Sequence, residues 1–291
     1  MWTKIDDRIS QATGEKFKTQ ERRTVGGGCI NQGYCLIGTQ KSYFVKTNRA
    51  VDIAMFTAEA LGLQQMGETH TIRVPKPIFC DTEKDTAYLV LEWLDLHGNS
   101  NNSAWEEMGR KLAALHKWQP GEKAKGFGWN INNTIGSTPQ INSWISDWGS
   151  FWAENRIGYQ LKLAKRRGGN FPQAEQLIEI IPEILGDRQP EPSLVHGDLW
   201  GGNAAISNSG EPVIFDPATY IGDREVDIAM TELFGGFPAA FYRGYNDFWP
   251  LHPGYDRRKT LYNLYHILNH FNLFGGGYAS QANRMIQEII K

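Results

Sequence analysis

The sequence predicts an α+β fold with two lobes: a small, β-rich N-terminal lobe with one helix and a larger, mainly helical C-terminal lobe. Two observations predict it. Strand-like runs of β-branched and aromatic residues dominate residues 1–92, whereas helical periodicity dominates residues 93–291. A chain of 291 residues is long enough for two lobes, each with its own core. A cleft between such lobes is a common place for a ligand.

The strands of the first lobe are predicted from short β-type runs. Residues 22–30 (RRTVGGGCI) form such a run, broken by three glycines. Residues 33–37 and 41–46 predict a hairpin that turns near Gly38. Residues 86–92 (TAYLVLE) are almost continuously apolar, which indicates a strand buried on both faces.

Two helices have clear boundary signals. Residues 52–66 predict a helix of the first lobe, with Asp52 as a candidate N-cap. Residues 257–274 predict a long helix of the second lobe, capped by Asp256 and ended by Gly275.

A third helix is predicted over residues 103–118, where apolar residues recur at helical spacing. Ser103 followed by Glu106 matches a capping box. Glu107 and Lys111 have the spacing of an i,i+4 ion pair.

Composition excludes several classes of protein. The net charge of −2 argues against a general nucleic-acid binder, which usually carries a strongly basic face. No apolar run approaches the length of a membrane span, and the N-terminus has no secretory signal pattern. The three cysteines lack the spacing of a zinc site, which favours reduced thiols in a cytoplasmic protein. The sequence carries no signal for an oligomeric state.

The strongest chemical signal is the segment VHGDLWGGN, residues 195–203. Asp198 is followed five residues later by Asn203, and Asp216 comes thirteen residues after that. A hairpin between Asn203 and Asp216 would return both to the same end, next to Asp198. Their oxygen atoms suit Mg²⁺, a metal that also binds substrate phosphates.

This spacing matches the layout of protein kinases. There an Asp accepts the proton of the acceptor hydroxyl, while an Asn five residues on and a second Asp hold the metal ions. We therefore predict a protein-kinase-like fold, with Asp198 as catalytic base and with Asn203 and Asp216 as metal ligands. The loop reads HGDLWGGN and the metal motif reads DPA. The Arg that reads a phosphorylated activation loop in protein kinases is absent, which makes that form of regulation doubtful here.

The first lobe supplies candidate ligands for the phosphates of ATP. Gly26, Gly27 and Gly28 lie between two predicted strands, where missing side chains let backbone N–H groups approach an anion. Lys46 in YFVK is placed to reach the α- and β-phosphates. Glu59, on the following helix, is the expected partner of that lysine.

The junction of the two lobes is the predicted adenine site. Glu92, Trp93 and Leu94 end the last strand of the first lobe, where backbone groups could hold the base. We assign His196 a scaffold role, since Asp198 already fills the position of the base. The sequence has no GxxxxGK[ST] motif and no GxGxxG dinucleotide fingerprint, which excludes a P-loop NTPase and a Rossmann site.

Longer motifs resemble the bacterial form of the fructosamine-3-kinase (ketosamine-3-kinase) family, within the aminoglycoside and choline phosphotransferase type of kinase. They are GGGCIN, YFVKTN, VPKPI, GFGWNINNTIGSTPQINSWISDW, LVHGDLWGGN, FDPATYIGDREVDIAM, LFGGFP and LYHILNHFNLFGGGY. They span nearly the whole chain, and HGDLWGGN with NHFNLFG is much more specific than the general kinase pattern. The resemblance implies transfer of phosphate from ATP, with Mg²⁺, to the 3-hydroxyl of a free or protein-bound ketosamine, a deglycation activity.

The acceptor side has weaker candidates. Trp200 lies two residues beyond the predicted base, so its ring could wall the sugar. The segment 126–148 is rich in Trp, Asn and Gly, and Trp129, Asn133 and Trp148 are candidates for an ordered loop over the acceptor or for core packing.

Two further residues have more specific hypotheses. By the family resemblance, Asp227 braces the catalytic loop from a helix start, where a carboxylate is favoured. Cys29, within the glycine run, would be redox-sensitive if its pKa were lowered.

Two alternatives stay open at this point. Another small-molecule kinase of the same fold, acting on an aminoglycoside, choline or a different sugar, would share every catalytic residue. A nucleotide-binding pseudokinase is the other, although such proteins generally lose the base, the metal ligand or the lysine, all of which are present here.

Overall fold

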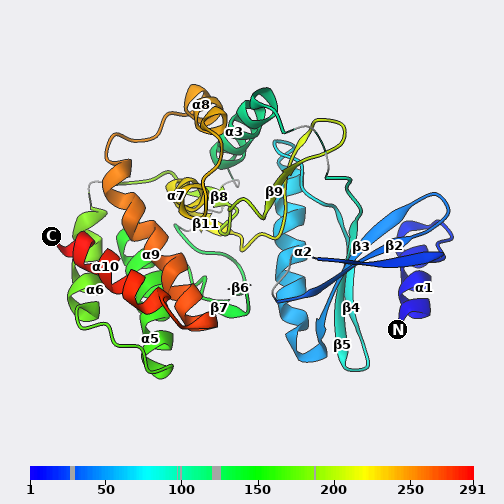
Figure 1. Cartoon of the computed structure of the whole chain (residues 1–291), viewed down its shortest axis with the longest axis horizontal. Helices are drawn as coiled ribbons and strands as arrows, with labels where there is room; N and C mark the ends of the chain where they lie inside the picture. The colour runs from blue at the N-terminus through cyan, green and yellow to red at the C-terminus, as the bar shows by residue number, and fades with distance from the viewer. Residues whose placement is uncertain (27–29, 97, 99, 120–125, 187) are drawn as a thin grey trace.

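A five-stranded antiparallel sheet forms one side of the molecule and helices form the other (Figure 1). The computed structural model describes residues 1–291 except 27–29, 97, 99, 120–125 and 187. The strand order is β1-β2-β3-β5-β4. The strands are β1 (Glu21–Val25), β2 (Gln32–Ile37), β3 (Ser42–Arg49), β4 (Pro77–Glu83) and β5 (Thr86–Glu92). The predicted α+β class is confirmed.

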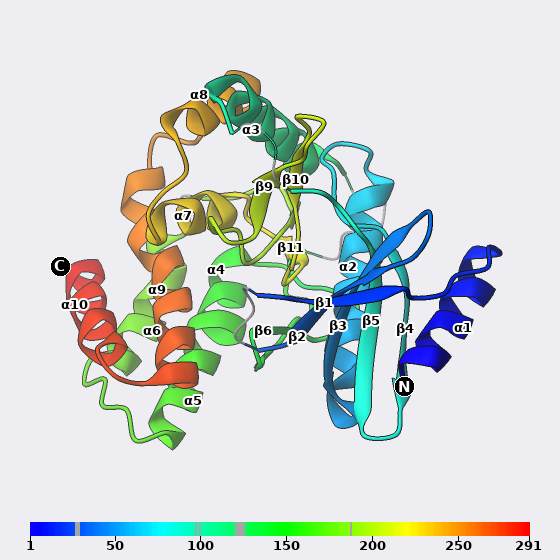
Figure 2. The ribbon, with the colours of Figure 1, turned by 45° about the vertical axis from the view of Figure 1, so that its right-hand side comes forward.

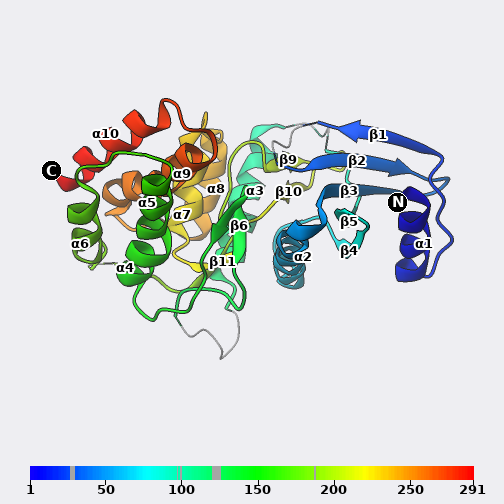
Figure 3. The same cartoon turned by 90° about the horizontal axis from the view of Figure 1, so that it is seen from below.

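Two helices pack on opposite faces of this sheet, α1 (Trp2–Thr13) and α2 (Ile53–Glu68), as Figure 3 shows from below. Tyr88 and Val90 of β5 lie in one buried apolar cluster with residues of α1. Leu89, which points to the other face, lies in the main core with residues of α2. Because both faces of β5 are covered, its sequence is almost continuously apolar.

The predicted elements of the first lobe are present, with the run over residues 22–30 forming β1 up to Val25, and two unpredicted elements join them, α1 and β4. The hairpin of residues 33–37 and 41–46 is β2 and β3, and the strand over 86–92 is β5. The N-terminal helix α1 goes beyond the sequence prediction. Only Ile5 and Ile9 of α1 are buried, so its apolar stripe is too short to give a strong helical signal.

The N-caps of the first two predicted helices are only partly confirmed. Asp52 takes the N-cap position of α2 as predicted, but its side chain pairs with Arg49 at 2.9 Å and makes no capping hydrogen bond. Helix α3 (Asn102–Lys117) begins before Ser103, and the side chain of Asn101 accepts the Ala104 N–H at 2.9 Å. An Asn is as effective an N-cap as a Ser, so the local sequence offered two competing caps.

The predicted side-chain partners of this helix also differ. Glu106 pairs with Arg243 at 2.7 Å, across to another helix, in place of the capping box. Glu107 pairs with Arg110 at 3.4 Å, whereas Lys111 lies 3.9 Å from Glu211. Tertiary neighbours therefore replace the predicted local partners of Glu106 and Lys111, whereas Glu107 keeps a local partner at different spacing.

The second lobe surrounds one long helix. Helix α9 (Tyr255–Phe274) is in contact with α5, α7 and α10 (Figure 2). Gly275, with φ of 72°, follows its last turn as predicted, while Gly254, and not Asp256, takes the N-cap position. The other helices are α3, α4 (Trp148–Phe151), α5 (Tyr159–Arg166), α6 (Ala174–Ile184), α7 (Glu225–Leu233), α8 (Ala239–Phe248) and α10 (Tyr278–Ile290), and a π-helical stretch, Trp152–Gly158, joins α4 to α5.

Three two-stranded ribbons carry the functional segments of this lobe. They pair β6 (Asn133–Ile135) with β7 (Thr138–Gln140), β8 (Ser193–Val195) with β11 (Tyr220–Gly222), and β9 (Ala204–Ile206) with β10 (Pro212–Ile214).

The two parts share one buried apolar cluster, and specific contacts also join them. Arg73 forms a parallel bridge with Val213, and Trp129 Nε1 donates a hydrogen bond to Gln65 Oε1 on α2 at 3.0 Å. The division into residues 1–92 and 93–291 stays a prediction, and β5 ends at Glu92. Among the helices of the described residues, none combines the length and apolarity that a bilayer span requires.

Candidate active site

The hairpin of β9 and β10 brings the predicted metal ligands together. Ala204 pairs with Ile214, and the Phe215 N–H donates to the Asn203 carbonyl at 3.0 Å. Asn203 and Asp216 thus return to the same end of the hairpin, as the sequence predicts. Gly210, with φ of 82°, allows the tight turn at the far end.

The predicted catalytic loop, residues 196–203, connects β8 to this hairpin and ends in a turn. Within it the Asn203 N–H donates to the Trp200 carbonyl at 2.9 Å. The Asn203 amide then donates to the Asp198 carbonyl at 2.8 Å and approaches the Asp198 carboxylate at 3.4 Å. Because the amide nitrogen is used internally, the amide oxygen of Asn203 remains as the group that can face a metal ion.

Lys46 joins the two halves of the site. Its ammonium donates to Glu59 of α2 and to Asp216, at 2.6 Å each. Burial would lower the pKa of Lys46, but the negative charges of Asp216 and Glu59 outweigh it and raise the pKa. The predicted Lys46–Glu59 pair is therefore present in the structure, and Asp216 joins it with φ of 60°, in the left-handed region.

Within the described part of the chain, the Asp198 carboxyl has no cationic partner of its own. Burial raises its pKa to about 7, and the charges of Asp216 and Asp227 add to this, against a smaller opposing effect of the Asn203 hydrogen bond. No cluster of three His, Cys, Asp or Glu side chains forms a preassembled metal site in the described residues. The oxygens of Asn203 and Asp216, beside uncompensated negative charge, nonetheless fit a divalent cation that completes its shell with water and phosphate.

Asp227, in the first turn of α7, holds the backbone of the catalytic loop. Its carboxylate accepts the N–H groups of His196 at 2.7 Å and Gly197 at 2.8 Å. It also accepts a hydrogen bond from His116 Nε2 at 3.0 Å. Burial raises its pKa, but His116, His196 and the Gly197 N–H outweigh it, so the pKa is lowered and Asp227 stays ionised. The expected bracing role is confirmed.

His196 is a scaffold residue, as predicted. Its Nδ1 accepts the Asp198 N–H at 3.3 Å, so Nε2 carries the proton and donates to the Phe215 carbonyl at 2.9 Å. Burial lowers the pKa of His196, which favours this neutral form. The ring ties the catalytic loop to the strand that carries Asp216, and neither nitrogen is left to act as a base.

A chain of buried side chains continues behind Asp227, and sequence reasoning missed it. Arg224 Nη1 donates to the Tyr245 hydroxyl at 3.1 Å, and that hydroxyl lies 2.8 Å from His116 Nδ1. The available signal was His116 itself, a polar residue on the apolar face of α3, because a buried polar group needs a partner.

The nucleotide side is described in part. Gly26 is exposed, whereas Gly27, Gly28 and Cys29 lie outside the described residues. Their predicted roles stay predictions.

At the predicted adenine site, side chains fix the connecting segment. Glu92 accepts hydrogen bonds from the Lys76 N–H at 2.6 Å and from Arg73 at 2.7 Å. Trp93 Nε1 donates to Asp95 at 2.8 Å. The contact of Glu92, Trp93 and Leu94 with adenine stays a prediction.

The acceptor candidates separate into one exposed ring and several buried groups. Trp200 is 38% exposed, two residues from Asp198. Trp129 and Asn133 are 4% and 8% exposed, and Trp148 is buried with its Nε1 bonded to Tyr262. Direct contact with an acceptor therefore fits Trp200, whereas Trp129 and Asn133 would act through the residues that they position.

Asn133 belongs to a buried network of amide side chains that reaches the backbone just after Asp216, called here the metal segment (residues 216–219). Its Nδ2 donates to the Thr219 carbonyl at 2.8 Å, and its Oδ1 accepts from Gln140 and Asn142 at 2.8 Å. Gln140 also donates to the Ala218 carbonyl at 3.0 Å. The segment 126–148 therefore clamps the chain that follows Asp216. Sequence reasoning did not single out Gln140 or Asn142.

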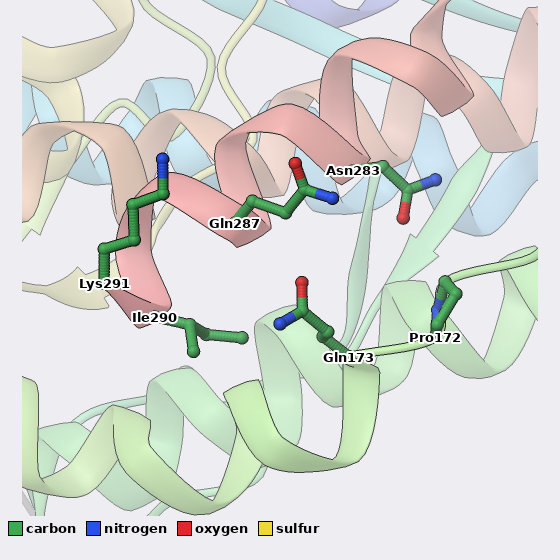
Figure 4. A pocket seen from close by; sticks show the side chains of 6 residues that line it. All are labelled: Pro172, Gln173, Asn283, Gln287, Ile290 and Lys291. Atoms are coloured by element: carbon green, nitrogen blue, oxygen red, sulfur yellow. The ribbon is translucent and has the colours of Figure 1, made fainter.

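A surface pocket where the start of α6 meets α10 is separate from this site (Figure 4). In Figure 1 these two helices lie at the end of the molecule away from the sheet. The pocket is lined by Pro172, Gln173, Asn283, Gln287, Ile290 and Lys291. Most of these side chains are polar, and Lys291 alone among them is titratable.

Comparison with known proteins decides the family. The sequence profile described as fructosamine kinase matches residues 1–291. The chain belongs to the fructosamine kinase family. A Synechocystis relative assigned as a ketoamine kinase is 59% identical over 290 residues, covering 100% of this chain and 97% of that protein. A chloroplastic protein-ribulosamine 3-kinase of Arabidopsis thaliana is 46% identical, covering 92% of this chain and 82% of that protein.

Solved structures agree with this membership. A crystal structure from Haemophilus somnus assigned as a fructosamine-3-kinase superposes with a TM-score of 0.93 at 31% identity, covering 100% of this chain and 98% of the other. An aminoglycoside phosphotransferase superposes with a TM-score of 0.63 at 15% identity, covering 98% of both chains, which shows a shared kinase-like fold. This member of the fructosamine kinase family is thus a phosphotransferase with the predicted fold.

Proposed function

We propose that this fructosamine kinase family member transfers a phosphoryl group from ATP, with Mg²⁺, to the 3-hydroxyl of a ketosamine of the fructosamine or ribulosamine type, free or attached to a protein. The observation that carries the chemistry is the convergence of Asp198, Asn203, Asp216 and Lys46 from three separate stretches of the chain. The acceptor class rests on the relatives, which are assigned as ketoamine and ribulosamine kinases.

The residues of the site support a division of labour. Lys46, held by Glu59, would bind the α- and β-phosphates together with the glycine segment. Asn203 and Asp216 would hold Mg²⁺, which when bound offsets negative charge on the transferring phosphoryl group. Asp198 would orient the acceptor hydroxyl and accept its proton. Because the site adds no covalent step of its own, positioning and electrostatics supply most of the rate.

The raised pKa of Asp198 fits this role. A general base works best with a pKa near the working pH, and burial beside Asp216 and Asp227 brings this carboxyl to about 7. A cation bound at Asp216 would remove part of that effect, so Asp198 would become ionised more readily as the site fills.

The acceptor is tested with purified protein, ATP and Mg²⁺ against a panel of small molecules. The panel holds a fructosamine, a ribulosamine, an aminoglycoside and choline, and mass spectrometry detects phosphorylated product. We expect product from one or both ketosamines and none from the last two, with Asp198→Asn as the inactive control. Phosphorylation of the aminoglycoside or choline alone would replace the proposed acceptor class. No product from any acceptor, with ATP bound, would favour a pseudokinase.

A further inference from the structure

The turn between the catalytic base and the metal ligand carries two adjacent glycines with different surroundings. We propose that Gly202 is a positioning residue for the acceptor: its missing Cβ lets the Trp200 indole lie against the turn, beside Asp198, where the ring walls the acceptor. The inference rests on the proposed function, since it explains how that acceptor wall is held in place.

The geometry at Gly202 leaves no room for a side chain. A Cβ there would lie 2.4 Å from both Cη2 and Cζ2 of the Trp200 indole and 2.9 Å from its Cε2. These are closer than non-bonded carbon atoms approach each other, and all three belong to the six-membered ring. The benzo ring of Trp200 therefore lies directly over the position that a Cβ would take.

Gly201 provides the contrast within the same turn. A Cβ at Gly201 would meet no atom within 4 Å. Neither Gly201 nor Gly202 has a φ in the left-handed region, so the backbone does not require glycine at either position. Space for the indole is the feature that distinguishes Gly202.

The position of the ring links this packing to the acceptor. Trp200 is partly exposed, and its carbonyl accepts the Asn203 N–H at 2.9 Å, so its backbone is fixed by the turn that ends at the metal ligand. An indole presents a large, rigid face to a sugar. A ring already held in the binding orientation loses less conformational entropy when the acceptor binds. Gly202 would thus act on acceptor affinity through Trp200.

Alanine at position 202 should displace the ring and leave the loop in place. The atoms that it would meet lie at the far end of a partly exposed side chain, which can rotate away at little cost. The Asn203–Asp198 contacts involve neither the Trp200 ring nor a side chain at 202. The expected effect therefore falls on the acceptor KM, with the ATP KM and the Mg²⁺ dependence unchanged.

The test compares steady-state kinetics of Gly202→Ala, Trp200→Ala, their double variant and the matched control Gly201→Ala, with a ketosamine acceptor. We expect Gly202→Ala and Trp200→Ala each to raise the acceptor KM about five- to tenfold, with ATP KM within about twofold. Gly201→Ala should keep the wild-type acceptor KM. In the Trp200→Ala background, Gly202→Ala should have no further effect, because the ring through which it acts is gone.

The outcomes separate this inference from the proposed function. If Trp200→Ala raises the acceptor KM but Gly202→Ala behaves like Gly201→Ala, the role of Gly202 is wrong and the acceptor wall stands. If Gly202→Ala raises the acceptor KM equally without the indole, it acts by another route and the proposal fails. If Trp200→Ala leaves the acceptor KM unchanged while ketosamine is still phosphorylated, Trp200 does not wall the acceptor and the proposal fails, although the kinase assignment holds.

A second variant covers the case in which Gly202→Ala does not fold. Trp200→Phe removes Cη2 and Cζ2, the two atoms that would lie nearest the new Cβ, so it should tolerate Gly202→Ala. We expect Trp200→Phe/Gly202→Ala to fold with the melting temperature and acceptor KM of Trp200→Phe alone. A double variant that is as unstable as Gly202→Ala would show that the glycine serves the backbone and would overturn the proposal.

Discussion

Two clusters of charged side chains are compensated differently: a buried rear cluster at the start of α7, and a partly exposed front cluster at the predicted catalytic loop. In the rear cluster each carboxylate has an arginine. Arg258 binds both oxygens of Glu225, at 2.7 and 2.9 Å, and Arg188 binds both oxygens of Asp223, at 2.9 and 3.1 Å. The fold alone therefore neutralises the rear cluster.

The front cluster, at the catalytic loop, has more carboxylates than cations. Lys46 is shared between Glu59 and Asp216, and the one side chain that the described residues place within hydrogen-bond distance of the Asp198 carboxylate is the Asn203 amide. Burial raises the pKa of both Glu225 and Asp198, but two arginines oppose the rise at Glu225, whereas at Asp198 the charges of Asp216 and Asp227 add to it. We infer that the rear cluster serves stability, whereas the proposed nucleotide and metal ion would complete the front cluster.

The largest expected effect breaks the front cluster at the base. Asp198→Asn keeps the size of the side chain but cannot accept a proton, so kcat should fall by about 10²–10⁴-fold. Steady-state kinetics with a ketosamine measure this. Binding of a non-hydrolysable ATP analogue should persist, which separates lost chemistry from lost folding. Retention of wild-type turnover would rule out Asp198 as the base.

The rear cluster should respond in stability. Arg258→Met leaves Glu225 buried with a weaker partner, Arg188 at 3.6 Å, and should lower the free energy of unfolding by about 3–5 kcal/mol. Urea denaturation measures this. The exposed pair of Arg243 and Glu106 provides the control, because Arg243→Met should leave stability nearly unchanged. Equal effects of the two variants would contradict the distinction between the clusters.

A substitution in the front cluster should raise stability, in contrast to Arg258→Met in the rear cluster. Asp198 has a folded pKa of about 7, above its ordinary value of 3.8, so the folded protein holds this proton more tightly than the unfolded chain. The free energy of unfolding therefore falls as pH rises from about 4 to about 7 and Asp198 becomes ionised. Above about pH 7 the whole destabilising effect of the ionised carboxylate is present. Asp198→Asn removes that effect.

Without Mg²⁺ and nucleotide, Asp198→Asn should thus melt at a higher temperature than wild type at about pH 8, and the gap should narrow at about pH 5. Differential scanning calorimetry at the two pH values measures it. A gap that widens on acidification would mean that the charge of Asp198 is already compensated.

The smallest predicted effect concerns the hydrogen bond from Gln140 to the backbone that follows Asp216. Gln140→Leu removes the donor to the Ala218 carbonyl, two residues after Asp216, and should raise the Mg²⁺ concentration for half-maximal activity about tenfold. Gln160→Leu is the matched control, because Gln160 is buried but bonds to Asn269 and Asn272 instead. An equal rise in both variants would indicate a general loss of order.

Local patterns predicted the geometry of the candidate site well. Spacing alone brought Asn203 and Asp216 to one end of a hairpin, and short-range rules found Lys46 and its helix partner Glu59. Turn residues and strand periodicity depend on a few neighbouring residues, so they can be recognised in a single sequence without knowledge of the fold.

Long-range partners could not be predicted in the same way. The contact between His116 and Asp227 joins positions 111 residues apart, and Gln140 reaches Ala218 across 78. The predicted N-cap of α3 was wrong for a related reason. Asn101 and Ser103 are equally good caps by local rules, and tertiary packing decides which of them caps the helix. The burial of Trp129 likewise depends on α2, through its bond to Gln65.

The most direct test of the account is a crystal structure with a non-hydrolysable ATP analogue and Mn²⁺ in place of Mg²⁺, located by its anomalous scattering. The account predicts a metal ion bound by the Asn203 amide oxygen and the Asp216 carboxylate, with Lys46 on the phosphates and still paired to Glu59. A bound nucleotide whose metal ion touches neither Asn203 nor Asp216 would contradict it.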